Sequence, residues 1–284
     1  LIVSRGLGDV YKRQVLIVYP IVGSWQWGGG FLSTFTDEVG FYDFAGSTLV
    51  HSVGGWGGLV IIYLLGARKG KFDSSGKAVA IPGSNIPLSA AGVLILWLGW
   101  FGFNGGSVLS ADPANTSLVL VTTCLAAAAG GLGATFLSTL MYKNLDITMF
   151  MNGVLGGLVG ITAGADQMGP TSAIIIGAIG GAVVVLGVAL LDKCKLDDPV
   201  GAIPVHLFAG IWGTLAVGLF GASAGFDQFM VQLASTGIVG VFCVIGASII
   251  ALIVKSIMGL RVSDEEEEIG LDISEHGTKA YFSS

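Results

Sequence analysis

Charged residues in this sequence fall in narrow bands that are separated by long uncharged stretches. Eight successive stretches lack Asp, Glu, Lys and Arg, and they cover residues 14–36, 44–67, 78–111, 113–142, 147–165, 167–191, 199–226 and 228–254. Each is near or above the roughly 20 residues that a helix needs to cross a bilayer. None alternates in the ten-residue segments of a membrane β-barrel. The pattern therefore predicts an all-α polytopic membrane protein.

The composition excludes the main alternatives. Only 11% of the 284 residues are charged, and 53% are apolar, so the chain has too little charge for the surface of a soluble domain of this size. The net charge is −6, with five consecutive acids at residues 264–268, and no basic patch points to nucleic acid. The three cysteines show neither a disulfide framework nor a metal motif.

Proline and glycine set the expected ends of the helices. Gly28–Gly30 interrupt the first stretch, and Pro87 moves the start of the third helix to about Leu88. We expect one transmembrane domain over residues 15–259 and a tail over 260–284. The expected spans are about 15–26, 46–66, 88–110, 116–142, 147–165, 171–191, 200–221 and 231–257.

Apart from Arg5, Lys12 and Arg13 before the first span, Lys and Arg are confined to every second loop. They follow the second, fourth, sixth and eighth spans, as Arg68, Lys69, Lys71, Lys77, Lys143, Lys193, Lys195, Lys255, Arg261 and Lys279. The alternate loops contain only acids, namely Asp37, Glu38, Asp43, Asp112, Asp166 and Asp227. Cytoplasmic loops are the ones enriched in Lys and Arg. The basic loops and the C-terminus are therefore predicted to lie in the cytoplasm.

Two histidines lie inside expected spans, and the sequence around them repeats. A shift of the sequence by 155 residues places His51 on His206. The same shift places Asp43, Gly46, Val50, Gly55, Gly58, Leu64 and Gly66 on Asp198, Gly201, Val205, Gly210, Gly213, Leu219 and Gly221. The two copies are the second and seventh spans, so they cross the membrane in opposite directions. Such an inverted repeat is typical of transport proteins.

The repeat places both histidines at a similar depth. Each lies about 12 Å along a helix from its aspartate, which is close to the midplane of a hydrocarbon layer about 30 Å thick. A single histidine at that depth is most simply a packed residue that bonds a neighbouring helix, whereas a repeat-related pair favours a functional role. Two histidines without a third ligand nearby make a poor zinc site.

Around these residues the sequence resembles the ammonium transporter family, which comprises the Amt, Mep and Rh proteins. The resemblance rests on residues 43–51 (DFAGSTLVH), 99–107 (GWFGFNGGS), 197–206 (DDPVGAIPVH), 210–213 (GIWG) and 270–277 (GLDISEHG). It covers roughly residues 15–284 and is closer to the Amt branch. It implies the family's inverted-repeat fold, in which eleven spans form two halves of five plus one.

The chain departs from that pattern at its beginning. We expect it to contain about eight of the eleven spans and to lack the family's first three, with the aromatic residue that they contribute to the outer vestibule. Residues 1–14 (LIVSRGLGDVYKRQ) match nothing in the family. We expect them to be a non-native segment of the kind that a translated sequencing adapter produces.

The resemblance implies a transporter or channel that recruits ammonium at an outer vestibule, deprotonates it and conducts ammonia through an apolar pore. Transfer of a small cation into a medium of low dielectric costs of order 20 kcal/mol, so such a pore selects the neutral molecule. His51 and His206 would line it as neutral rings, each with one donor and one acceptor. Phe103 matches the family's lower gating phenylalanine, for which ordinary core packing is the alternative.

Four further residues are candidate ammonium contacts by the same resemblance: Trp27 and Ser107 at the vestibule, Asp43 at the outer end of the second span, and Thr162 beside the pore. Most have a simpler alternative. The alternative role of Trp27 is that of an interfacial belt residue, and that of Asp43 is the cap of a helix that begins at Phe44. For Thr162 the alternative is a hydrogen bond to its own helix backbone. We expect Trp100 to be a packing residue.

The resemblance also implies a homotrimer in the plasma membrane, with lipid around it and a cytosolic nitrogen-regulatory protein as a partner by analogy. We expect no cofactor, no metal, no nucleic acid partner and no enzymatic activity, because no nucleophile–base set appears. Two other functions remain open. One is an ammonium sensor that signals through the tail, and the other is an Rh-type channel for neutral ammonia or carbon dioxide.

Overall fold

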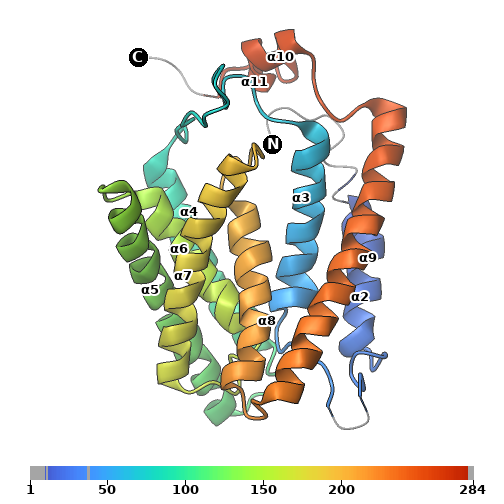
Figure 1. Cartoon of the computed structure of the whole chain (residues 1–284), viewed down its shortest axis with the longest axis vertical. Helices are drawn as coiled ribbons and strands as arrows, with labels where there is room; N and C mark the ends of the chain where they lie inside the picture. Colours follow the sequence, from blue (N-terminus) through green and yellow to red (C-terminus); the bar gives the residue numbers. More distant parts are fainter. Residues whose placement is uncertain (1–9, 11, 37–38, 281–284) are drawn as a thin grey trace.

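The chain folds into an upright bundle of helices (Figure 1). The computed structural model describes residues 10, 12–36 and 39–280, and most of the segment 1–14 that we expected to be non-native lies outside these residues. In the described part the only β pairing is an isolated antiparallel bridge between Phe72 and Ala78. The elements, with η marking π-helical turns, are η1 (Gln14–Val18), α2 (Tyr19–Gln26), η2 (Ser47–Ser52), α3 (Val53–Leu65), α4 (Ile86–Gly106), α5 (Pro113–Tyr142), α6 (Ile147–Thr162), α7 (Pro170–Lys193), η3 (Ile203–Phe208), α8 (Ala209–Phe220), α9 (Phe226–Met258), α10 (Asp264–Ile269) and α11 (Leu271–Ser274).

Six helical segments of the described residues are long and apolar enough to cross a membrane. They are Ser47–Leu65, Ile86–Gly106, Pro113–Tyr142, Pro170–Lys193, Ile203–Phe220 and Phe226–Met258. This confirms the class of all-α polytopic membrane protein. Of the eight expected spans, the fifth is shorter than its expected bounds: α6 has 16 residues, because the chain turns after Thr162. The first runs through η1 and α2 to Gln26, before the glycine run.

Three of the helices, α4, α5 and α6, begin at a side-chain cap. Oxygens of Asn85, Asp112 and Asp146 accept hydrogen bonds from backbone N–H groups in the first turns of α4, α5 and α6, which satisfies donors that have no partner inside a helix. Because Asn85 caps α4, this helix starts at Ile86, two residues before the expected Leu88.

Glycine allows α5, α6 and α7 to pack closely. A Cβ atom added to Gly130 or Gly157 would overlap the backbone of the facing helix, and the same holds for Gly177 and Gly181. Such close approach is the use of small residues in membrane helices. The three helices form a compact group on one side of the bundle (Figure 1).

The two ends of the bundle differ in charge. At one end, which we call the basic end, the tail helix α10 lies over the loop that follows α3 (Figure 1). There Lys69 Nζ contacts Glu268 at 2.7 Å, and Arg261 contacts Glu267 at 2.7 Å. The other end, the acidic end, consists of loops 27–46, 107–112, 163–169 and 221–225, which contain no Lys or Arg. Of its acids, Asp37 and Glu38 lie outside the described residues.

Candidate functional site

His51 lies in a π-helical turn that starts from an aspartate cap at the acidic end. One carboxylate oxygen of Asp43 accepts the backbone N–H groups of Gly46 and Ser47, each at 2.9 Å, and the other accepts those of the next two residues at 2.8 and 2.9 Å. The helix begins at Ser47 and not at Phe44 as expected, because Gly46 has φ of 112° and breaks the backbone there. Asp43 is buried and acts as a cap.

His206 lies in a second π-helical turn that is built in the same way from the basic end. Asp198 accepts the backbone N–H groups of Ala202 at 3.0 Å and Ile203 at 2.7 Å. Gly201, which the repeat pairs with Gly46, also has a positive φ, of 75°. The matched residues of the repeat therefore have matched backbone roles, since only glycine adopts such angles without strain.

The two histidine-bearing helices cross at matched glycines. A Cβ added to Gly55 would lie 2.7 Å from the backbone nitrogen of Leu207, and one added to Gly210 would lie 2.5 Å from the Ser52 hydroxyl. Gly55 pairs with Gly210 under the repeat, and Ser52 pairs with Leu207. Exchanging the two helices thus gives the same pair of contacts. These contacts hold the two backbones close enough for the side chains of this turn to meet.

The two histidine rings lie against each other. Their Nδ1 atoms are 3.2 Å apart, and the ring centroids are 5.3 Å apart with 21° between the planes. A bond between two neutral rings requires an N–H on one Nδ1 and a lone pair on the other. The Nε2 atom of His51 is buried and has no hydrogen-bond partner among the described residues. This atom is therefore available to a small polar molecule.

Two aromatic side chains of α4 cover His51. The ring of Trp100 stacks on it with centroids 5.0 Å apart and 16° between the planes, and Phe103 lies 5.6 Å away at 50°. We expected Trp100 only to pack, but it contacts His51 directly. A sequence signal for this was present, because Trp100 lies one helical turn before Phe103 in the same motif.

Thr162 lies behind Trp100. Its hydroxyl donates to the Leu158 carbonyl at 2.7 Å, which is the bond to its own helix backbone that we considered as the simpler role. The same oxygen accepts the indole N–H of Trp100 at 3.0 Å. Both contacts are buried, so Thr162 fixes the indole that stacks on His51.

The vestibule candidates lie at the acidic end, where each bonds a backbone carbonyl. Trp27, 43% exposed, donates its indole N–H to the carbonyl of Asp43 at 2.8 Å. The Ser107 hydroxyl donates to the Phe103 carbonyl at 2.9 Å. No hydrogen bond joins Trp27 to Ser107 in the described part of the chain. The structure therefore brings His51, His206 and Phe103 together, with Trp27 linked to them through the Asp43 segment.

Gln232 is a residue of this region that the sequence analysis missed. It is fully buried in α9. Its side-chain oxygen accepts the backbone N–H of Tyr42 at 2.9 Å, and its nitrogen donates to the carbonyls of Tyr42 at 2.7 Å and Thr214 at 3.0 Å. Gln228 and Gln232 are four residues apart in an otherwise apolar stretch, and that spacing was the available signal.

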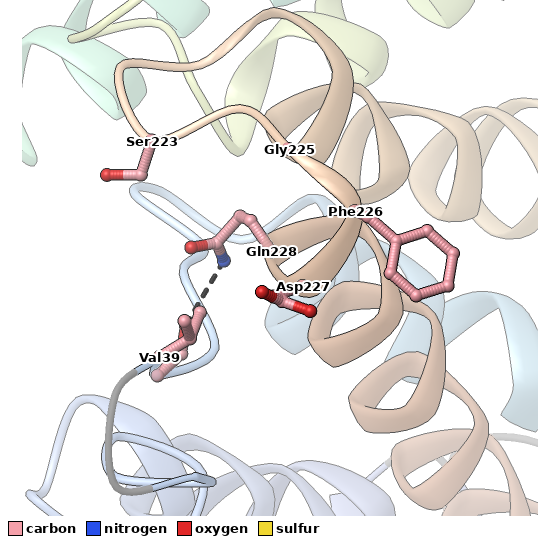
Figure 2. Close-up of a pocket in the computed structure, with 7 residues that line it drawn as sticks. Val39, Ser223, Gly225, Phe226, Asp227 and Gln228 are labelled. Carbon is pink, nitrogen blue, oxygen red and sulfur yellow. Dashed lines mark hydrogen bonds between the residues drawn. The ribbon is translucent and has the colours of Figure 1, made fainter.

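A surface hollow of about 430 Å³ lies elsewhere at the acidic end. It is lined by Val39, Gly40, Ser223, Gly225, Phe226, Asp227 and Gln228. Figure 2 shows Gln228 extended toward the segment at Val39, where it donates to the Gly40 carbonyl at 3.1 Å, while the ring of Phe226 points away. None of the predicted site residues lines it. In the described residues no group of three or more His, Cys, Asp and Glu is placed to hold a metal ion.

Comparison with known proteins identifies relatives of the chain. The sequence profile described as Ammonium Transporter Family matches residues 14–281. Ammonium transporter Amt2 of Archaeoglobus fulgidus is 43% identical over 297 residues, which cover 96% of this chain and 63% of that protein. A putative ammonium transporter of Synechocystis is also 43% identical, over 95% of this chain and 63% of that protein. The chain thus spans under two thirds of the length of these relatives, which are named as transporters and not as enzymes.

Solved structures show the same fold. A structure titled Sensor Amt Protein matches with a TM-score of 0.86 and 36% identity, over 91% of this chain and 67% of that one. The crystal structure of Candida albicans Mep2 matches with a TM-score of 0.80 and 28% identity, over 88% of this chain and 58% of that one. The profile match, the identity and the fold together confirm the resemblance: the chain belongs to the ammonium transporter family.

Proposed function

We propose that the protein moves ammonium across the plasma membrane by conducting ammonia along a path lined by His51 and His206. The observation that carries the proposal is the partly buried pair of stacked rings with Nδ1 atoms 3.2 Å apart. Polar groups inside an apolar bundle are energetically costly, so a pair of them at this depth usually has a function. The relatives at 43% identity are named as ammonium transporters, which favours transport over the sensor function.

The proposed path has three parts. At the acidic end Trp27 and Ser107 attract ammonium, since an indole face draws a cation by roughly 0.5–2 kcal/mol. Phe103 then separates this mouth from the histidines. A cation loses its hydration there at a cost of order 20 kcal/mol, so ammonium gives up its proton to water at the mouth and neutral ammonia passes. The proton follows separately along the bonded His51 and His206 rings, which makes the transport electrogenic. Inside, the free Nε2 of His51 offers a hydrogen bond to ammonia or water.

The proposed architecture is an inverted repeat. Its support is the matched pairs: aspartate caps at Asp43 and Asp198, positive-φ glycines after each cap, and reciprocal contacts at Gly55 and Gly210. By family resemblance we further propose a homotrimer with one pore per subunit. We propose that the basic end and the tail face the cytoplasm, where a nitrogen-regulatory protein could dock.

Growth rescue tests the function. The full-length protein that carries this sequence is expressed in a cell that lacks ammonium uptake, and growth is measured at limiting ammonium. We expect rescue by the wild type and by His276→Ala, which changes the exposed histidine of the tail. We expect much weaker rescue by His206→Ala. Absence of rescue by the wild type, with the protein present at the cell surface, would contradict the proposal.

A further inference from the structure

Tyr42 and Asp166 form a contact that the proposed path does not use. The Tyr42 hydroxyl donates to the Oδ2 atom of Asp166. Tyr42 belongs to the segment between α2 and η2, whereas Asp166 belongs to the loop between α6 and α7, so the bond joins parts of the chain that are far apart in sequence. Both residues are at the acidic end, and neither was a candidate site residue.

The bond lies in a set of contacts that fixes the segment in front of η2. Backbone N–H groups of Phe44 and Ala45 donate to the carbonyls of Ala163 at 2.9 Å and Thr162 at 3.2 Å. On the other side of the segment, the Gln232 side chain forms hydrogen bonds with both the N–H and the C=O group of Tyr42. The next carbonyl along the chain, that of Asp43, accepts the indole of Trp27. The position of the Trp27 indole therefore depends on this segment.

The repeat gives Tyr42 a counterpart at the basic end. Under the same shift Tyr42 falls on Asp197, the residue before the second aspartate cap. Asp197 is held by Arg68, with Nε–Oδ2 at 2.8 Å and Nη2–Oδ1 at 2.9 Å. Each cap segment is thus held in place by a contact of the residue that precedes the cap. The two contacts differ in charge, because Arg68 neutralises the carboxylate of Asp197 at the basic end, whereas no arginine of the described residues bonds the carboxylate of Asp166 at the acidic end.

The Asp166 carboxylate is therefore an uncompensated charge. The loops of the acidic end contain no Lys or Arg, and the Oδ1 atom of Asp166 is buried without a hydrogen-bond partner among the described residues. Burial raises the pKa of Asp166, although the bond from Tyr42 acts in the opposite direction. Burial, followed by the bond to Asp166, also raises the pKa of Tyr42, so its hydroxyl stays protonated and donates. Asp43 is the other titratable group that acts on Tyr42.

We propose that Asp166 is a positioning residue for the ammonium-recruiting mouth: through Tyr42 it fixes the segment that holds Trp27, and its negative charge favours a cation there. This rests on the proposed function. Because the pKa of Asp166 is raised, the carboxylate takes up a proton at a higher pH than an ordinary aspartate does. Acidification therefore removes the charge, and the affinity for ammonium falls as the pH falls.

Uptake kinetics of methylammonium by the full-length protein in vesicles test the proposal. Asp166→Asn removes the charge, Tyr42→Phe removes the donor, and Asp166→Glu keeps the charge. Asp227→Asn, an acid of the same end that lies outside the path, is the matched control. We expect Asp166→Asn and Tyr42→Phe to raise KM by about ten-fold or more, the effect of losing one hydrogen bond to a charged group, with little change in maximal rate. Asp166→Glu recovers part of the loss, and the control is unchanged.

The pH profile separates this role from a merely structural one. As the pH falls from about 7.5 toward the usual aspartate pKa of about 4, ammonium stays protonated, whereas an aspartate with a raised pKa takes up its proton before that value is reached. We expect the wild-type KM to rise over this range and the KM of Asp166→Asn to stay flat. An unchanged KM in Asp166→Asn, or a loss of maximal rate alone, would overturn the proposal.

Amide hydrogen exchange of the purified protein tests the positioning without any transport. Residues 42–49 should exchange faster in Asp166→Asn and Tyr42→Phe than in the wild type and in Asp227→Asn. Equal exchange in all four proteins would overturn the positioning role. A wild type that fails to transport, together with this exchange difference, would contradict the proposed function and leave the positioning role supported.

Discussion

At the scale of single residues, the surroundings of His51 depend on one hydroxyl. Thr162 accepts the indole N–H of Trp100, and Trp100 stacks on His51. The hydroxyl is fully buried, so neither group has water as an alternative partner. An unpaired buried donor costs about 1–3 kcal/mol. The orientation of the stacked indole therefore depends on the Thr162 hydroxyl.

We predict that Thr162→Val destabilises the protein by about 1–3 kcal/mol, because it leaves the Trp100 indole N–H buried without an acceptor. Thermal unfolding in detergent measures the loss. Thr162→Ser, which keeps the oxygen, is the control and should remain close to the wild type. Equal stability of the valine and serine variants would show that the indole has found another partner.

Sequence reasoning at this scale found the residues that carry a repeated signal and missed those that do not. His51 and His206 were predictable because the shift that pairs them also pairs their aspartates and glycines. Tyr42 and Asp166 were not predictable as partners, because their contact joins two loops and neither residue repeats as a like side chain. Trp100 was assigned to packing because a tryptophan in an apolar run has no pattern that indicates what it faces.

At the scale of elements, the histidine pair depends on how closely two helices cross. Gly55 lies against the backbone of Leu207, whereas the neighbouring Gly54 has nothing within 4 Å of an added Cβ. The two adjacent glycines therefore offer a matched test of the crossing. Both have ordinary helical backbone angles, so only the space around them differs.

We predict that Gly55→Ala destabilises the protein by about 1–3 kcal/mol, the usual cost of overpacking, and lowers uptake by moving the histidine rings apart. Gly54→Ala should be neutral or slightly stabilising, because alanine is the better helix former. Unfolding and methylammonium uptake are measured for both. Similar behaviour of the two variants would contradict the close crossing.

The ion pair of Arg68 and Asp197 joins the end of α3 to the start of the second cap. The Asp197 side chain is 2% exposed. Burial acts to raise the pKa of Asp197, but the hydrogen bonds from Arg68 outweigh it and hold the pKa below its usual range. The pair therefore stabilises the fold above the usual aspartate pKa, and this contribution is lost as the pH falls through the lowered value.

We predict that Arg68→Ala costs about 3–5 kcal/mol near neutral pH, because it leaves a buried carboxylate without its charged partner. The cost should shrink as the pH falls, since Asp197 can then take up a proton in the variant. Unfolding at several pH values measures this. Arg68→Lys, which keeps the charge but not the two-point contact, should lie in between. A cost that does not vary with pH would contradict the electrostatic cause.

The helices were the most predictable elements. Banded charge and the caps at Asn85, Asp112 and Asp146 are local signals, and local signals determine where helices begin. The misplaced start at Ser47 has a tertiary cause. Asp43 reaches over Gly46 and the chain is not helical before that glycine, because Phe44 and Ala45 bond the segment at the end of α6. Nothing in the segment's own sequence indicates those partners.

At the scale of the whole molecule, the two ends are separated by charge. The tail is tied to the basic end by Lys69, Arg261 and the acids of α10. If positive loops stay in the cytoplasm, that end and the tail face inward and Trp27 faces outward. Cys194 offers a native probe of this orientation, because it is free and exposed just after α7 at the basic end.

We predict that a membrane-impermeant thiol reagent labels Cys194 only after the cell is opened. The matched probe is Asp227→Cys at the acidic end, which should be labelled in intact cells. Cys194→Ser gives the background from the other two cysteines, of which Cys243 is buried. Labelling of Cys194 in intact cells would reverse the proposed orientation.

The central claim is that the transport path for ammonium is lined by His51 and His206. The most direct test is the ammonium-evoked current in vesicles that contain the full-length protein. Wild type and His276→Ala should give the same current at a given ammonium concentration. His51→Ala removes one half of the ring pair, and we expect the current to vanish while ammonia still crosses, as followed by internal pH. A His51→Ala protein with the current and the conduction of the wild type would contradict the account.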